Sequence, residues 1–346
     1  MSPFLEKKSV KPFHPHPFPP KHLHEKTYSK LLKIANRSLQ EYSFFLSQIS
    51  PLTPFLYQLI NLEAIASVES HKVKTTLENF LRFTQMKHPK KSSKEALVHH
   101  YREALIWGCK NIGKLSISKK LLCTLHKKAK RKTVFQADLG AYRNRQNWIG
   151  PEDCDIEEAY FYPPAENEVE DLMEKLLGYA KKNEKESLIQ LALFMAQLLI
   201  VHPFMDGNGR VARILIPLFL YQKKAIPLPF FFMSRFFRHH RLQYFQTLFT
   251  TTEENKWEPW IIFFLKGIII ETKHTLSLFK QILSLNDEIK QKAPTLKKET
   301  IAFIFKNPIF PNSSLKKAKG LKRSKFIRKG KDGMYYFFPL LKIISK

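Results

Sequence analysis

The sequence is poor in cysteine, glycine and acidic residues. Its three cysteines, Cys109, Cys123 and Cys154, form neither a metal-binding spacing nor an even disulfide set, which favours a reducing compartment. Only 11 glycines occur in 346 residues, and apolar residues recur at helical spacing, so we expect a mostly helical protein. Lys and Arg outnumber Asp and Glu by 58 to 30, a formal net charge of +28. This excess fits an acidic partner such as nucleic acid or nucleotide phosphates, or plain compositional drift toward lysine.

Long hydrophobic runs are also missing. The longest, "LIQLALFMAQLLIV", carries two glutamines and is too short to cross a bilayer. The N-terminus "MSPFLEKKSV" lacks the apolar segment of a secretory signal peptide. We therefore expect a cytoplasmic protein without a membrane span, and delivery into a host cell stays open. A hydrophobic content of 44% is enough for a packed core.

Composition and periodicity divide the chain into three parts. An N-terminal helical segment is expected over 1–95, beginning with an irregular arm rich in Pro, His and Lys over 1–30. A core follows over 96–290. Helical patterns run from 28 to 83 with a break at the prolines of 50–54, and again from 166 to 289. Ser93 is the expected N-cap of a helix that places one apolar face inward. The members of that face are Ala96, Leu97, Tyr101, Ala104 and Leu105.

Two segments lack a helical period. Between 135 and 168, short strands at 146–149 and 159–162 are expected to form a hairpin. The basic segment 291–346 carries a Lys-Asp-Gly turn before "MYYFF", which indicates a second small hairpin. A compact winged-helix-like module and a solvated basic tail are both open for this segment. Its charge predicts weak, salt-sensitive nucleic-acid binding.

The stretch "HPFMDGNGRVAR", residues 202–213, combines groups that suit phosphate chemistry. A buried apolar helix ends near His202, because Pro203 disfavours the α conformation of the residue before it. A second helix begins near Gly209, so the glycine-rich loop feeds a helix N-terminus, a favourable place for an anion. Asn208 can donate to phosphate oxygens.

The charged side chains of the same stretch complete the pattern. Arg210 and Arg213 share one helix face and can hold phosphate bidentately. Asp206 is a hard oxygen ligand for Mg²⁺, which is usually held by one carboxylate together with phosphate oxygens. His202 is a natural base near neutral pH. These residues predict a site for a nucleotide phosphate and Mg²⁺, with a histidine that takes a proton from a nucleophile.

The stretch resembles the signature of the Fic family, His-Pro-Phe-x-Asp/Glu-Gly-Asn-Gly/Lys-Arg-x-x-Arg, at every defined position. "AYRNRQNWIG" and "AYFYPPAENEVEDLM" are similar to the family's substrate-clamping hairpin, the flap, and "SRFFRHHRLQYFQTL" and "WEPWIIFFLKGI" to the helices after the motif. The resemblance implies an all-α fold: a Fic-type helical core with a β-hairpin flap and a small C-terminal winged-helix-like module.

The resemblance also implies a reaction, the transfer of AMP from ATP to a Ser, Thr or Tyr hydroxyl of a target protein. His202 would be the base and Asp206 would hold Mg²⁺. The flap, between Asn147 and Tyr162, would pair with the target as an added strand, and the protein could modify itself. The anion hole would be formed by Gly207, Asn208, Gly209 and Arg210, with Arg213 reaching the γ-phosphate. Phe204 would anchor the motif, and Tyr244 and His239 are candidates for the ATP pocket.

One departure concerns regulation. Relatives of this layout carry a Ser/Thr-x-x-x-Glu-Gly/Asn latch whose glutamate pairs with the second motif arginine. Here "SVESHK" keeps Ser67 but has His71 at the glutamate position. Glu69 lies two residues earlier, about 200° around a helix, and should not replace it. We therefore expect weak or absent autoinhibition, with Arg213 free.

Alternative functions stay open. A relative with the same fold could move another phosphate-containing group, such as UMP, phosphocholine or a phosphoryl group. Removal of AMP depends on the latch glutamate in this family, so its absence counts against that use. A nucleic-acid-binding regulator with a nucleotide-sensing core is the non-enzymatic alternative, but it needs neither His202 nor Asp206.

Overall fold

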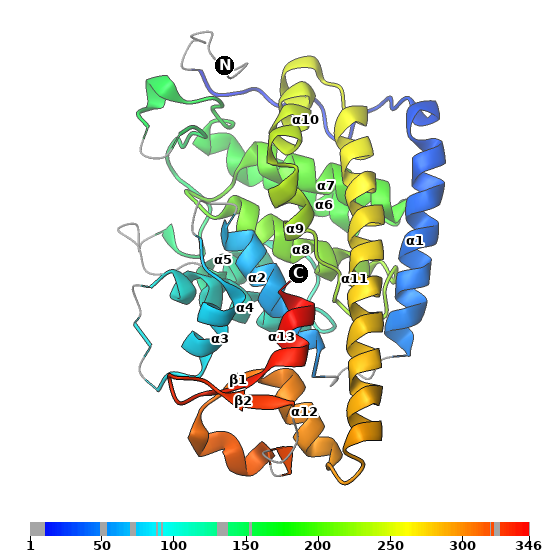
Figure 1. The fold of residues 1–346 in the computed structure, drawn as a ribbon. Coiled ribbons are helices and arrows are strands. Elements are labelled where there is room, and N and C mark those ends of the chain that lie inside the picture. The colour runs from blue at the N-terminus through cyan, green and yellow to red at the C-terminus, as the bar shows by residue number, and fades with distance from the viewer. Residues whose placement is uncertain are drawn as a thin grey trace.

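The chain forms a mainly helical structure, described here from a computed structural model (Figure 1). The described residues are 11–48, 54–69, 74–87, 89–90, 93–129, 138–151, 154–318, 320–321 and 326–345. The helices in chain order are α1 (Ser29–Ser47), α2 (Leu56–Glu69), α3 (Leu77–Thr84), α4 (Lys94–Asn111), α5 (Lys119–Ala129), α6 (Val169–Lys181), α7 (Ser187–Val201), α8 (Asn208–Gln222), α9 (Ser234–His239), α10 (Arg241–Glu254), α11 (Glu258–Lys292), α12 (Lys298–Lys306) and α13 (Phe338–Ile344). The all-α expectation is confirmed.

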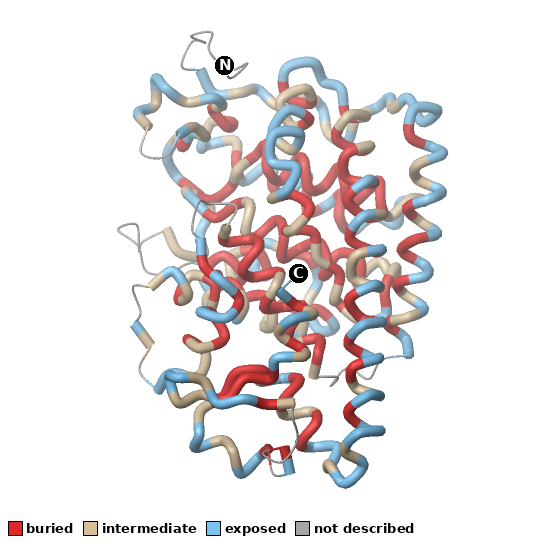
Figure 2. Tube along the Cα trace, in the orientation of Figure 1, coloured by how far each residue is buried: buried red, intermediate tan, exposed pale blue. Residues whose placement is uncertain are grey.

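Helices α7 and α8 form the centre of the core (Figure 2). Every residue of α7 from Leu188 to Val201 is buried, as the apolar run in the sequence predicts. Helices α6, α8, α10 and α11 pack around it. The indole Nε1 of Trp260 on α11 donates to the carbonyl of Ala192 at 2.7 Å and fixes α11 to this central helix. The motif segment therefore connects two largely buried helices.

Helix α4 begins where the sequence predicts it. The Ser93 hydroxyl accepts a hydrogen bond from the amide of Ala96 at 3.2 Å, which is an N-cap. On the expected inward face, Leu97 alone is partly exposed, and the other four residues are buried. The helical pattern of 28–83 corresponds to α1, α2 and α3. The residues of the predicted break at 50–53 lie outside the described residues.

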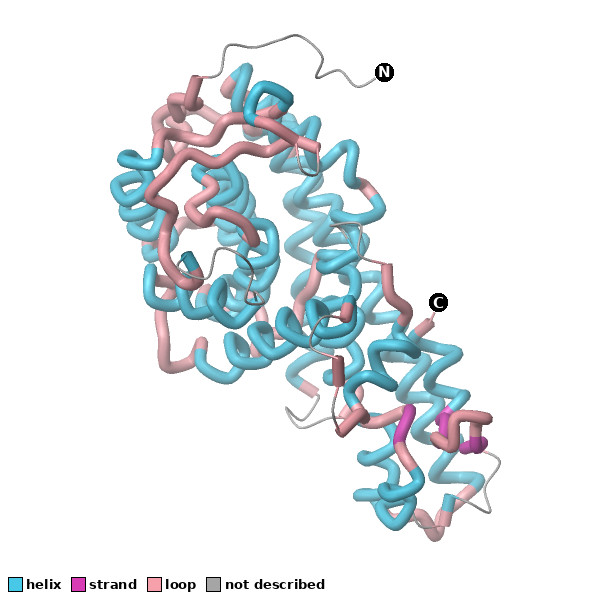
Figure 3. Tube along the Cα trace, turned by 90° about the vertical axis from the view of Figure 1, so that its left-hand side faces the viewer, coloured by secondary structure: helices cyan, strands magenta, loops and turns pink. Residues whose placement is uncertain are grey.

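The C-terminal segment folds on the far half of α11. Its strands β1 (Ile309–Phe310), β2 (Ile327–Lys329) and β3 (Tyr335–Phe337) form an antiparallel sheet in the order β1-β3-β2. Figure 3 shows the strands at the end of the molecule opposite the N-terminus. The turn before β3 places Gly333 at φ 76°, a conformation that suits glycine.

The predicted C-terminal hairpin is therefore present as β2 and β3, and α13 packs back on α11. The comparison with a winged helix stays a prediction. The division at 95 and 290 also stays a prediction, since α4 and α11 each run across one of these positions.

The predicted flap hairpin is narrower than expected. The two segments meet at a single antiparallel bridge between Ile149 and Phe161, and neither segment is a continuous strand. The two segments are also joined by a side-chain hydrogen bond, from the Gln146 amide to the carbonyl of Pro163. A short 3₁₀ turn at Ile156–Glu158 lies in the connection between the two segments. The hairpin prediction is right in its pairing and wrong in the length of its strands.

The sequence predicts no membrane span and no disulfide set, and the structure can be compared with both predictions. None of the helices within the described residues is long and apolar enough to span a membrane. The three cysteines are unpaired.

Candidate active site

The backbone of 202–208 turns sharply between α7 and α8. His202 follows the last residue of α7 in a left-handed conformation (φ 51°, ψ 58°), and its amide still donates to the Leu198 carbonyl. The sequence predicts that the helix ends near His202, because a proline follows it, and this helix end is confirmed. The helix ends in a left-handed C-cap. A non-glycine residue held in this way costs free energy and is typical of functional sites.

The His202 imidazole is placed to act as a neutral base. Its Nδ1 lies 3.0 Å from the Leu199 carbonyl, which assigns the ring proton to Nδ1 and leaves Nε2 as the acceptor. Burial lowers the pKa of His202 to about 4. The positive charge of Arg143 lowers this pKa as well, whereas Asp206 opposes the shift. The imidazole is therefore unprotonated at neutral pH.

The start of α8 offers the backbone amides that the sequence predicts. Gly207 has φ 87°, a conformation that suits glycine, and its carbonyl accepts the first helical bond from the amide of Val211. The amides of Asn208, Gly209 and Arg210 lie ahead of that bond, where a helix has no carbonyls of its own to pair with them. This end of the helix suits a phosphate group.

Asp206 stands beside these amides with a half-exposed side chain. Its Oδ1 accepts from the amide of Gly207 at 2.5 Å, and its Oδ2 accepts from Arg210 at 3.0 Å. The described residues contain no cluster of three or more His, Cys, Asp or Glu side chains that could hold a metal ion. A single carboxylate beside a phosphate site fits Mg²⁺, which takes few protein ligands and several oxygens from phosphates and water.

Residues 116–220, which include α5, the flap, α6, α7 and most of α8, match the sequence profile of the Fic/DOC family. The chain therefore contains a Fic/DOC domain over these residues. The Fic domain supports a Fic-type transferase. Residues 202–213 are called the Fic motif below.

Solved structures of other Fic proteins share the fold. A Fic family protein from Desulfovibrio desulfuricans G20 has a TM-score of 0.63 at 16% identity, over 92% of this chain and 98% of that chain. A Fic domain-containing signaling protein from Bacteroides thetaiotaomicron has a TM-score of 0.54 at 15% identity, over 69% and 94%. Fic-1 from C. elegans has a TM-score of 0.55 at 18% identity, over 73% of this chain and 73% of that chain. At such identities the likeness shows the fold alone.

The side chain of Asn208 has a structural role in the Fic motif. Its Oδ1 accepts from the amide of Phe204 at 2.9 Å and its Nδ2 donates to the Phe204 carbonyl at 2.7 Å. The residue is 2% exposed. In this structure the side-chain amide of Asn208 is bonded to the backbone of Phe204, and its donation to a phosphate stays a prediction. Phe204 is fully buried, as expected of an anchor.

Arg213 is engaged by the N-terminal segment. Its Nε donates to the Ser67 hydroxyl at 2.9 Å, and its Nη2 donates to the Ser67 carbonyl at 3.2 Å. The expectation that Arg213 is free is wrong in this structure, because α2 packs against the start of α8. Gly209 makes room for this arrangement, since a Cβ there would lie 2.9 Å from Nη1 of Arg213.

The latch position itself, His71, lies outside the described residues. Glu69, the last residue of α2, forms an ion pair with Arg238 and not with Arg213. This agrees with the expectation that Glu69 does not replace the missing glutamate. Ser67 is the residue of the degenerate latch that reaches the Fic motif.

Two positioning residues were missed in the sequence. Arg143 is 3% exposed and donates from Nε to the His202 carbonyl at 3.0 Å and from Nη2 to the Pro164 carbonyl at 2.5 Å. It therefore joins both ends of the flap region to His202. Asn147 donates to the carbonyl of Phe204 at 2.9 Å. Polar residues in a loop carry no signal of such roles, because the bonds depend on how the loop packs.

A third missed residue is His126 on α5. Its Nδ1 accepts from the amide of Gly140 at 3.0 Å, so its Nε2 carries the proton and donates to the Asp206 carbonyl at 2.9 Å. The ring stacks on Phe204 with centroids 4.1 Å apart. His126 thus fixes the backbone of the candidate metal ligand.

The two weaker candidates for the ATP pocket, Tyr244 and His239, have different surroundings. Tyr244 packs among aromatic rings, with Phe237 at 5.4 Å and Trp260 at 5.6 Å. Burial raises its pKa to about 12, and Arg213 opposes this shift. His239 is exposed and its Nδ1 contacts the Arg235 carbonyl of its own helix. An ATP-binding role for these two residues stays a prediction.

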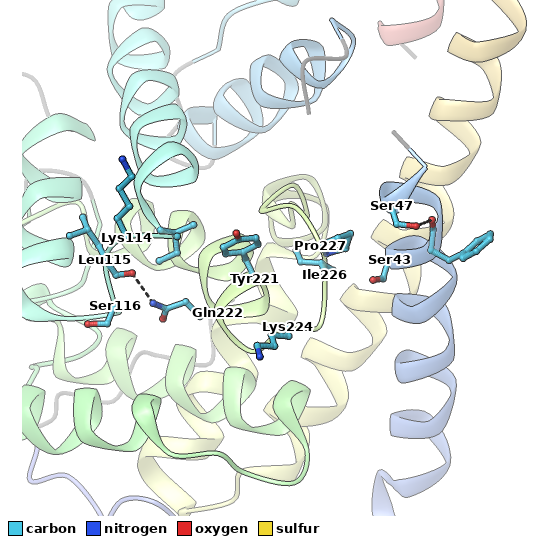
Figure 4. A pocket seen from close by; sticks show the side chains of 13 residues that line it. Ser43, Ser47, Lys114, Leu115, Ser116, Tyr221, Gln222, Lys224, Ile226 and Pro227 are labelled. Atoms are coloured by element: carbon cyan, nitrogen blue, oxygen red, sulfur yellow. Dashed lines mark hydrogen bonds between the residues drawn. The ribbon is translucent and has the colours of Figure 1, made fainter. Parts of the chain in front are cut away.

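Two surface hollows do not include the Fic motif. One of about 710 Å³ lies between the end of α1, the α4–α5 loop and the end of α8 (Figure 4). Another of about 620 Å³ lies at the base of the flap and includes Tyr142 and Arg143. The ring of Tyr142 contacts Phe204. The candidate site is therefore identified by its chemistry and not by the depth of a cavity.

Proposed function

We propose that the protein is an adenylyltransferase that transfers AMP from Mg·ATP to a Ser, Thr or Tyr hydroxyl of a target protein. The observation that carries the proposal is the junction of α7 and α8. A neutral, partly buried imidazole follows the end of α7. Four residues later a carboxylate precedes the N-terminus of α8, where the amides of Asn208, Gly209 and Arg210 have no helical carbonyl partner. This arrangement combines a base with an anion site in one loop.

The reaction assigns a role to each group. Nε2 of His202 accepts the proton of the target hydroxyl, and the hydroxyl oxygen forms a bond to the α-phosphorus. The bond from that phosphorus to the bridging oxygen breaks, and pyrophosphate leaves. The amides of Asn208, Gly209 and Arg210 bind phosphate oxygens. Asp206 would hold Mg²⁺, which neutralises phosphate charge. The flap would hold the target segment through backbone bonds.

Ser67 modifies the expected regulation. A serine hydroxyl and a carbonyl hold Arg213, where the latch of relatives supplies a carboxylate. A neutral acceptor pairs with a guanidinium less strongly than a carboxylate does. We therefore propose a weakly autoinhibited enzyme in which Arg213 leaves Ser67 to reach the γ-phosphate, with self-modification as one outcome. Other transferred groups remain alternatives, because the Fic motif contacts phosphates and not the base of the nucleotide.

The test separates these alternatives by the position of the label. The full chain is incubated with Mg²⁺, total protein lysate and ATP labelled in the α- or the γ-phosphate. We expect protein labelling from α-labelled ATP alone, and mass spectrometry should place AMP on a hydroxyl side chain. Labelling from γ-labelled ATP would indicate phosphoryl transfer, and preferential labelling from α-labelled UTP would indicate UMP transfer. Either result would overturn the proposal.

A further inference from the structure

The N-terminal arm, residues 11–24, crosses the molecule from α1 to the flap. Figure 1 shows it running along the top, past the ends of α11 and α10. The amide of Phe13 donates to the carbonyl of Tyr162 at 2.9 Å. The Phe13 ring lies 5.5 Å from the ring of Phe161. The arm thus contacts the second segment of the flap through both backbone and side chain.

The contact uses the outer edge of the flap. Ile149 and Phe161 exchange both of their backbone bonds, at 2.9 and 3.1 Å, so the polar groups of Phe161 point toward the first flap segment. In an extended chain the next residue points its groups to the opposite side. The carbonyl of Tyr162 is therefore an outer-edge acceptor, and Phe13 occupies it in the way an added strand would.

Further contacts hold the arm along its length. Nε2 of His16 lies 2.9 Å from the Thr252 carbonyl on α10. The Phe18 ring packs against Tyr179 at 4.9 Å. The amide of His24 donates to the Glu258 carboxylate at 2.7 Å. Five prolines between 12 and 20 keep this stretch extended and reduce the entropy lost on docking.

The flap and the arm are complementary in charge. Residues 151–168 contain seven acidic residues and no Lys or Arg, in a chain whose net charge is +28. Asp155, Glu157 and Glu158 are exposed. The arm contributes Lys11 and His14, and His14 lies 3.7 Å from Glu168. The segment that contacts the flap through Phe13 and His14 thus carries lysine and histidine, and the flap beside it is acidic, with Asp155, Glu157 and Glu158 left exposed.

We propose that the arm occupies the outer edge of the flap in cis, and that the partner this edge fits is an extended, basic protein segment with an aromatic side chain in place of Phe13. The proposal rests on the proposed function, in which the flap receives the target. It identifies the class of target sequence, and it makes release of the arm a step of target binding. A tethered arm has a high effective concentration, so it excludes weak competitors.

The test measures peptide binding without nucleotide. The probe is a fluorescent peptide with the sequence of residues 11–20, "KPFHPHPFPP", and binding to the full chain is followed by anisotropy. Phe13→Pro removes both the amide donor and the ring from the arm. We expect this variant to bind the peptide about tenfold more tightly than the parent, the factor that one net hydrogen bond and one ring pair supply. Phe13→Ala, which keeps the donor, should give a smaller gain.

Lys30→Ala, on α1 and outside the arm, is the control, because Lys30 is exposed, and this variant should bind the peptide like the parent. Glu157→Lys combined with Glu158→Lys, in the Phe13→Pro background, should weaken binding. Equal affinity of the parent and Phe13→Pro would overturn the proposal, as would equal binding of a peptide whose first phenylalanine is alanine. Labelled-AMP transfer is measured separately. Tighter peptide binding by Phe13→Pro without any AMP transfer would support this inference and overturn the proposed function. AMP transfer without a change in peptide binding would support the proposed function and overturn this inference.

Discussion

Arg213 and Ser67 lie 146 positions apart in the sequence and are joined by a hydrogen bond of 2.9 Å from the guanidinium Nε to the hydroxyl Oγ. The bond links α2 to the second arginine of the Fic motif. It places Ser67, a neutral residue, on the side chain to which the proposed function assigns the γ-phosphate.

Replacement of Ser67 by alanine should therefore activate the enzyme. The variant loses the hydroxyl acceptor and keeps the carbonyl acceptor, so we expect the initial rate of AMP transfer at subsaturating ATP to rise roughly fivefold, the factor for about 1 kcal/mol. Ser43→Ala on α1, far from the Fic motif, is the control. A Ser67→Ala variant with the parental rate would show that this contact does not restrain Arg213.

A carboxylate at the latch position should have the opposite effect. His71→Glu restores the residue type that pairs with the motif arginine in relatives. A charge-assisted pair of about 1.5–3 kcal/mol would lower the transfer rate roughly tenfold to a hundredfold. Adding Arg213→Ala should relieve this inhibition at a cost in ATP affinity. His71→Gln should leave the rate near the parental value, and equal rates for all three residues at 71 would exclude a latch here.

His202 should be essential for transfer but not for ATP binding. His202→Ala should lower the transfer rate by roughly a hundredfold to ten-thousandfold, the usual contribution of a general base. Nucleotide affinity, measured by calorimetry, should change little. Because the pKa of His202 is lowered to about 4, the base form persists above that pH, and the rate should hold between pH 8 and 5.5. A histidine with an ordinary pKa near 6.5 would lose about tenfold by pH 5.5.

The buried Glu63 on α2 should make stability depend on pH. Burial raises its pKa to about 7, against the opposing bonds from Ser234 and Tyr101. A raised carboxyl pKa contributes stability that is complete below the ordinary value near 4.5 and is lost as the pH rises through about 7. Glu63→Gln does not titrate, so from pH 4.5 to 8 it should gain on the parent by up to about 3 kcal/mol. Urea unfolding at several pH values measures this difference, and parallel curves would contradict the shifted pKa.

The basic C-terminal segment should bind nucleic acid weakly and with a strong salt dependence. Among its cations, Lys316, Lys317, Arg328, Lys329 and Lys331 are exposed, and Lys319, Lys322, Arg323 and Lys325 lie outside the described residues. Lys316→Glu with Lys317→Glu should weaken binding to a DNA duplex and reduce the slope of log K against log salt by about 2. Lys30→Glu with Lys33→Glu on α1 is the charge-matched control. An equal loss in both double variants would mean that net charge, and not this segment, is responsible.

The sequence alone determined the helical class, the ends of α7 and α8, and the loop of base, carboxylate and amides between them. These features follow from local rules: apolar periodicity marks helices, glycine and proline mark their ends, and Ser93 caps a helix through the amide three residues ahead. The motif groups lie within twelve consecutive residues, so their proximity needs no knowledge of the fold.

Only the tertiary structure decided which partners these groups have. Asn208 turns inward to the backbone of Phe204, Arg213 contacts Ser67, and Phe13 joins the flap at Tyr162. Each of these donors and acceptors could form hydrogen bonds with many other groups. Which partner it has depends on how the helices and loops pack against one another. A hydrogen bond between distant residues has no period or spacing in the sequence, because it forms only after the core has placed both ends within about 3 Å.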